Sequence, residues 1–234
     1  MSSAPADTLK PPRGEPHRID GEASRQRLLQ AGLRLFAQQG YARTSTRELA
    51  EAAQVNVAAI GYYFGDKAGL YRAVFFEPLG APEKDIAAYS GSELSLPEAL
   101  RGFYAGLLEP LRLGDTARLC IKLRMREMLE PTGLWDEELM HGIEPMHKAL
   151  RAVLCRHFGV ADSDDTPDDE LARLAVCICG LAVHLHVGHD VIDAVAPQLN
   201  AAPDAIDRWA ERLQMYALAM IDAEMQRRSA KEPA

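Results

Sequence analysis

The sequence is short of cysteine and aromatic residues, and it has no long uninterrupted apolar run. None of its four cysteines forms a CxxC pair, and all four lie in apolar segments with helical spacing, so we expect buried, reduced thiols rather than a disulfide framework. No apolar run approaches the roughly 18–20 residues that cross a bilayer. Residues 1–16 contain no apolar stretch suited to a signal peptide. These absences predict a cytoplasmic protein without a membrane partner.

Charge is distributed unevenly along the 234 residues, whose net charge is −8. Residues 21–72 carry seven Lys and Arg against four Asp and Glu, a net of +3. Residues 1–20 carry three of each sign, so residues 73–234 carry −8 − 3 = −11. A basic head on an acidic body is typical of a protein that meets phosphates with one end only.

The spacing of apolar residues predicts helices along almost the whole chain, and period-2 alternation of useful length is absent, so the expected fold class is all-α. Residues 1–20 are rich in Pro, Gly and charge, and we expect a disordered arm there. The basic residues of the arm could reach a DNA groove. A solubilising tail without a further role is the alternative.

Three short helices with a tight turn are indicated after residue 23. Leu29, Leu33 and Phe36 form the stripe of a first helix, which Gly40 should end with a left-handed cap. Ser45 followed by Glu48 is a capping box, so a second helix should start near residue 46. After a turn at 53–55, an Asn N-cap at 56 opens a third helix. This is the pattern of a helix-turn-helix, whose third helix enters the major groove.

Residues 25–75 closely resemble the DNA-binding domain of the tetracycline-repressor (TetR) family. The matching strings include LF (35–36), GY (40–41), TSTRELA (44–50), YYF (62–64), DK (66–67) and LY (70–71). Two positions depart from the family pattern. Gln54 stands where the turn usually has Gly, so we expect it in a left-handed or otherwise tolerated conformation. Gly61 stands where many members have an aromatic residue, which removes any contact from a side chain there.

The resemblance implies a dimeric transcriptional regulator, most commonly a repressor released from a palindromic operator by a small-molecule effector, with no cofactor. It implies a helix-turn-helix domain at 21–79 and a helical domain for ligand binding and dimerisation at 80–234. Activation instead of repression stays open, and the identity of the effector is not readable from the sequence.

Roles in the first domain follow partly from geometry and partly from the resemblance. Val57 and Ile60 should face the core, which turns Ala58, Ala59 and Tyr62 toward the groove. Two helix N-termini suit phosphates, and the resemblance adds phosphate contacts from two Tyr and one Lys and a DNA contact from one Arg. A core position for one tyrosine and a plain surface charge for the lysine are the alternatives. The expected DNA-binding residues are Thr46, Arg47, Asn56, Ala58, Ala59, Tyr62, Tyr63 and Lys67.

The second domain offers apolar, sulfur and polar side chains on neighbouring predicted helices, the mixture of a usual small-molecule site. Met residues could equally be core filler. The ligand residues expected here are Arg124, Met125, Met128, Trp135, His147 and His184.

We expect no metal centre and no catalysis in the second domain. Cys177 with Cys179, and His184 with His186, are two residues apart, so on a helix each pair points about 200° apart and cannot chelate one ion. The sequence has no nucleophile elbow, phosphate loop or HExxH. A helical adaptor would share the amphipathic helices without explaining the TetR-like strings.

Dimerisation is expected through the last two long segments, about 168–188 and 204–227, which together could build a four-helix bundle across a two-fold axis. The apolar stripes assigned to this interface could also be core within one subunit. They comprise Leu171, Leu174, Ile178 and Leu181 in the first segment, and Trp209, Leu213, Tyr216 and Met220 in the second.

Overall fold

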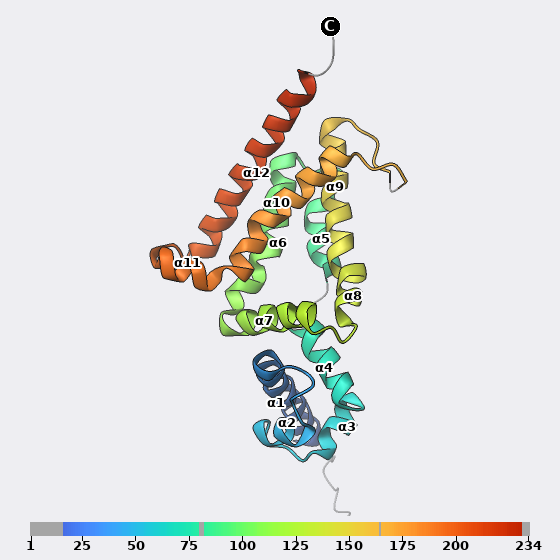
Figure 1. The fold of residues 1–234 in the computed structure, drawn as a ribbon, viewed down its shortest axis with the longest axis vertical. Coiled ribbons are helices and arrows are strands. Elements are labelled where there is room, and N and C mark those ends of the chain that lie inside the picture. The colour runs from blue at the N-terminus through green and yellow to red at the C-terminus, as the bar shows by residue number, and fades with distance from the viewer. Residues whose placement is uncertain (1–15, 80–81, 164, 231–234) are drawn as a thin grey trace, which may run out of the picture. The chain divides into compact units, whose positions relative to one another are not determined.

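The computed structural model describes residues 16–79, 82–163 and 165–230. Every regular element in these ranges is a helix, which confirms the all-α prediction (Figure 1). The chain divides into two compact units, Met1–Val74 (unit 1) and Phe75–Ala234 (unit 2), and the division falls within helix α4 (Lys67–Phe76). The arm expected at 1–20 lies outside the described residues up to residue 15, and helix α1 includes residues 16–20.

Unit 1 contains α1 (Pro16–Gln39), α2 (Thr46–Ala52), α3 (Ala58–Phe64) and most of α4. The stripe predicted for the first helix is buried, as are apolar side chains from the other three. α1 ends at Gly40, which has a φ of 83° and donates its N–H to the carbonyl of Phe36 at 2.9 Å, so the left-handed cap is confirmed. The core of unit 1 includes Leu28, Leu29, Leu33, Phe36, Leu49, Ile60, Leu70 and Val74.

Unit 2 is a helical domain in which α6 (Leu96–Leu108) packs against α5 (Pro82–Ser90), α9 (Glu144–Phe158), α10 (Asp169–Val187) and α12 (Ala205–Ser229). Buried tyrosine hydroxyls join its helices: Tyr104 donates to the carbonyl of Ile178 and Tyr89 to that of Met146, each at 3.0 Å. Burial also raises the pKa of Tyr104 well above its ordinary value. The elements are η1 (Glu77–Leu79), α5 (Pro82–Ser90), α6 (Leu96–Leu108), η2 (Glu109–Leu113), α7 (Asp115–Leu129), α8 (Leu134–Glu138), η3 (Leu139–Ile143), α9 (Glu144–Phe158), α10 (Asp169–Val187), α11 (His189–Val195), η4 (Pro197–Leu199) and α12 (Ala205–Ser229).

Pro145 lies within a continuous helical stretch. Pro145 has no N–H to donate and lies in the first turn of α9, where that loss costs nothing. The residues before it form a π-helical turn, η3, between α8 and α9. In place of the expected kink or break at Pro145, the helical backbone continues from α8 to α9 and changes to a π-helical turn just before the proline.

Helix α10 is the one helix in the described ranges that is long and apolar enough, by length and composition alone, to cross a membrane, with a mean hydropathy of 1.5 over its most apolar window.

Leu171, Leu174 and Ile178 of α10 are buried in the core of unit 2, and so is Leu213 of α12. These four residues were expected at a dimer interface, and the structure corrects that assignment in favour of the core. Tyr216, also expected at the interface, is exposed, together with Val176, Val183, Val187, Met215 and Met225.

Candidate functional site

The second helix of unit 1 begins with the predicted capping box. Ser45 Oγ accepts from the N–H of Glu48 at 3.2 Å, and Glu48 Oε2 accepts from the N–H of Ser45 at 2.8 Å. These bonds satisfy donors that a helix start would otherwise leave unpaired. They also lower the pKa of Glu48. The capping box therefore fixes where α2 starts, with Thr46 and Arg47 exposed in its first turn.

The turn between α2 and α3 has a left-handed residue within it and a hydrogen bond from α1 at its start. Gln54 has a φ of 55°, so the left-handed conformation expected from its place in the glycine position is confirmed. Arg27 of α1 donates from Nε to the carbonyl of Ala53 at 3.0 Å, at the C-terminal end of α2. This contact of Arg27 could not be predicted from the sequence, because an arginine on a helix surface carries no local signal of the group that it will bind.

The exposed face of helix α3 carries only small residues until Tyr62, near its C-terminal end. Asn56, predicted as the N-cap, lies one residue before the N-cap Val57, and its Oδ1 accepts from the N–H of Ala58 at 2.9 Å. Ala58, Gly61 and Tyr62 follow at i, i+3 and i+4, and all three are exposed. A Cβ added at Gly61 would meet no atom within 4 Å. The exposed face is therefore open along its length, with Tyr62 83% exposed at its C-terminal end.

One expectation for this helix is wrong. Ile60 is buried as predicted, whereas Val57 is 51% exposed. Val57 lies at the helix N-cap rather than inside α3, so the helical spacing that places Ile60 inward does not apply to it. Ala59 is half-buried beside it.

The two tyrosines and the lysine differ in how far they reach into solvent. Tyr63 is half-buried and its ring packs edge-on against that of Tyr62, with centroids 4.8 Å apart. Lys67 is half-buried too, and its Nζ lies 4.2 Å from the centroid of the Tyr41 ring. A cation above an aromatic face is stabilised there, so the lysine is held against unit 1 rather than extended freely.

The ligand residues expected in unit 2 differ in how far they are enclosed. The guanidinium of Arg124 is largely enclosed, 3.5 Å from a carboxylate oxygen of Glu138 and 5.0 Å from the centroid of the Phe75 ring. Trp135 and His147 are half-buried, and burial lowers the pKa of His147. Exposed positions are taken by Met125, Met128 and His184.

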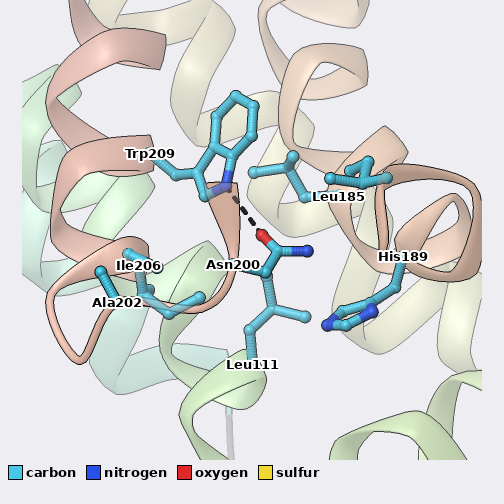
Figure 2. A pocket seen from close by; sticks show the side chains of 9 residues that line it. Leu111, Leu185, His189, Asn200, Ala202, Ile206 and Trp209 are labelled. Carbon is cyan, nitrogen blue, oxygen red and sulfur yellow. Dashed lines mark hydrogen bonds between the residues drawn. The ribbon is translucent and has the colours of Figure 1, made fainter. Parts of the chain in front are cut away.

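A cavity of about 150 Å³ lies elsewhere in unit 2, between η2, the end of α10, α11 and the start of α12 (Figure 2). None of the six expected ligand residues lines it. The cavity could not be predicted from the sequence, because its walls come from four separate elements. The lining residues are Leu111, Leu185, His189, Ile192, Asn200, Ala202, Ala205, Ile206 and Trp209.

The cysteine and histidine pairs of α10 lie as helix geometry requires. Cys179 is buried and Cys177 is exposed, so Cys177 departs from the expectation that every thiol is buried. His184 is exposed, whereas His186 Nε2 donates to the carbonyl of Leu107 at 2.9 Å. Within the described ranges, no three His, Cys, Asp or Glu side chains come close enough to hold a metal ion.

Glu127 and Glu130, one helical turn apart at the end of α7, have separate structural roles. Glu130 pairs with Arg126 at 3.3 Å, the ordinary ion pair expected from their spacing. Glu127 is buried, and its Oε1 accepts from Thr132 N–H, Thr132 Oγ1 and Leu134 N–H at 2.6, 2.8 and 3.2 Å. Glu127 therefore fixes the turn from α7 to α8.

Comparison with known proteins agrees with this geometry in both units. A family described as "Bacterial regulatory proteins, tetR family" matches residues 28–74. A second, described as "HTH-type transcriptional dual regulator CecR, C-terminal domain", matches residues 96–224, more than half of the chain. The chain is 31% identical over 159 residues to the dual regulator CecR of Shigella flexneri, an alignment that covers 63% of this chain and 70% of that protein.

Solved structures share the fold at low sequence identity. The fatty acid degradation regulator FadR from Bacillus halodurans aligns with a TM-score of 0.59 at 14% identity, covering 83% of this chain and 94% of FadR. NalD, the secondary repressor of the MexAB-OprM multidrug efflux pump in Pseudomonas aeruginosa, aligns with a TM-score of 0.53 at 20% identity, covering 86% and 98%. At these identities the likeness concerns the fold alone.

The helix-turn-helix geometry, the helical second unit and the sequence matches across both units agree. The relatives are transcriptional regulators and not enzymes. The chain belongs to the TetR family of helix-turn-helix transcriptional regulators, and its C-terminal domain is of the CecR type.

Proposed function

We propose that this regulator binds a palindromic operator as a homodimer, most simply as a repressor, and that a small-molecule effector held by unit 2 releases it. The observation that carries the proposal is the exposed face of α3 beside a capped α2. A recognition helix placed in this way can enter the major groove. The basic charge of residues 21–72 favours the approach to phosphates. Since operator DNA lies in the cytoplasm of a bacterium, we infer a cytoplasmic location.

We divide the proposed DNA-binding residues by the contact each can make. Ala58 and Ala59 can touch thymine methyl groups. Phosphate contacts are assigned to the remaining residues, because such contacts position the protein without reading sequence. These remaining residues are Thr46, Arg47, Asn56, Tyr62, Tyr63 and Lys67.

The proposed dimer uses the exposed apolar side of two helices. Val176, Val183 and Val187 lie on one side of α10, at i, i+7 and i+11, and α10 packs beside α12 in unit 2 (Figure 1). Two such helices per subunit can form a four-helix bundle about a two-fold axis. Burial of this surface in a dimer would also account for the apolar composition of α10.

Operator binding is tested with the DNA upstream of the gene that encodes this chain. We expect the wild-type protein to shift this DNA in a mobility assay, and Arg47→Ala and Tyr62→Ala to weaken binding about tenfold or more, since a charged or well-placed contact contributes about 1–3 kcal/mol. Arg34→Ala is the matched control, because Arg34 is an exposed arginine of α1 outside the α2–α3 surface. Equal losses in Arg34→Ala and Arg47→Ala would show that only overall charge matters.

A further inference from the structure

The cavity beside Trp209 has the composition of a small ligand site. Its apolar wall comes from Leu111 of η2, Leu185 of α10, Ile192 of α11 and Ile206 of α12. An engineered cavity of this volume, lined by similar residues, accommodates one benzene ring. The indole of Trp209 adds an aromatic surface, which favours another ring packed against it. Size and lining together fit a single-ring molecule.

One side of the cavity is polar, and its groups are held in fixed orientations. Trp209 Nε1 donates to Asn200 Oδ1 at 3.1 Å (Figure 2). Asn200 Nδ2 donates to Asp193 Oδ1 at 2.8 Å. His189 Nδ1 lies 2.9 Å from the other oxygen of Asp193. The Asn200 amide has a second N–H that these bonds do not use. The Asn200 amide therefore offers a hydrogen-bond donor next to the apolar wall.

The charges near the cavity compensate each other. Arg118 Nη2 lies 3.6 Å from Asp193 Oδ2 and 3.5 Å from His189 Nε2. A charged ligand would enter a partly apolar space without a free partner of opposite charge, which is costly. The site therefore suits a neutral molecule with one polar substituent.

The walls are fixed by contacts outside the cavity. Arg112 of η2 donates to the carboxylate of Asp207 of α12, and this bond raises the pKa of Arg112. η2 is thereby attached to the first turns of α12, which contribute Ala205, Ile206 and Trp209 to the lining. A site with such fixed walls needs little ordering when a ligand enters.

We propose that this cavity is an effector site for a neutral, single-ring aromatic molecule with one hydroxyl or amino group. The role as an effector site depends on the proposed function, whereas the binding itself does not. A ligand here would contact the ends of α10 and α12, the two helices assigned to the dimer interface.

Calorimetric titration of the full-length protein with phenol tests binding directly. We expect saturable binding that cyclohexanol, the non-aromatic counterpart, matches only about tenfold more weakly or not at all. In Trp135→Phe protein, Trp209 is the remaining tryptophan, and phenol should change its fluorescence with the same midpoint. Absence of saturable phenol binding, or equal affinity for cyclohexanol, would overturn the proposal.

Two variants locate the site. Ala202→Phe should fill the cavity and abolish phenol binding, whereas Ala201→Phe, at an exposed neighbour outside the lining, should leave it unchanged. Phenol binding that survives Ala202→Phe would place the ligand elsewhere and overturn the assignment.

The two proposals fail separately in this design. Operator binding is measured without phenol, so its absence counts against the proposed function alone. Phenol binding is measured without DNA, so its absence counts against the cavity alone. Where both occur, phenol should lower operator affinity about 5–150-fold, the usual range of coupling between two sites. Unchanged operator affinity at saturating phenol would overturn the effector role.

Discussion

Gln54 occupies a backbone conformation that glycine adopts more readily. Its φ of 55° costs a residue with a Cβ roughly 1–2 kcal/mol. Gln54→Gly should therefore raise the free energy of unfolding by about 0.5–1 kcal/mol, after the greater flexibility of glycine in the unfolded chain is counted. Urea denaturation of the full-length protein measures this change.

The control places the same substitution within a helix. Gln30 is exposed in the middle of α1, so Gln30→Gly should lower the free energy of unfolding by about 1 kcal/mol. Destabilisation by both substitutions would show that the Gln54 side chain contributes more than its backbone conformation costs.

At the scale of helices, the ends of α10 and α12 are joined by a compact group of charges. Arg228 donates to both oxygens of Asp168, at 2.9 and 2.7 Å, while the same carboxylate caps the N-terminus of α10. Bonds from Arg228 lower the pKa of Asp168 to about 2. Bonds from Arg227 and Arg228 lower that of Glu224 to about 2. A lowered pKa means that the folded state prefers the charged carboxylate.

This group predicts a stability that depends on pH. Because both pKa values are lower in the folded state, the contribution is complete above about pH 4.5 and is lost as pH falls toward 2. Arg228→Gln should lower the free energy of unfolding by about 2 kcal/mol at neutral pH. The same substitution should also reduce the loss of unfolding free energy between about pH 4.5 and 2.5, and urea denaturation at several pH values measures this loss.

Surface ion pairs within α10 provide the control for Arg228→Gln. Arg173 reaches Glu170 and Asp169 from an exposed position, so Arg173→Gln should change stability by less than about 1 kcal/mol. Identical pH profiles for wild type and Arg228→Gln would contradict the assignment of the acid sensitivity to Asp168.

The helices themselves were largely predictable, because their signals are local. The capping box of Ser45 and Glu48 and the cap at Gly40 each depend on residues within one or two turns. The side of a helix that faces another subunit is not a local property. A stripe such as Leu171, Leu174 and Ile178 has the same spacing whether it packs within one subunit or across two.

The ligand site shows the same limit more strongly. Arg124 and Met125 lie close in sequence on α7, yet the arginine is enclosed and the methionine is exposed. The cavity of unit 2 is made by residues from 111 to 209, which only the packing of several helices brings together. The periodicity of one segment does not indicate which residues of other segments will pack around the same cavity.

For the whole molecule, assembly should depend on the exposed side of α10. Val183→Asp should convert the dimer to a monomer in light scattering and reduce operator affinity strongly, because two half-sites would then be bound independently. Leu129→Asp changes an apolar residue of α7 that is more exposed still, and it should leave the dimer intact. A Val183→Asp protein that remains dimeric would move the interface to another surface.

Two small, exposed positions on α3 bear on how this regulator could change its targets. Ala58 and Gly61 carry almost no side chain, and a Cβ added at Gly61 would meet no protein atom within 4 Å. Substitutions there need not disturb the core that Ile60 fills from the opposite side. Operator preference can therefore drift during evolution at little cost to folding, and duplicated copies of such a gene can acquire separate regulons through single changes on one short helix.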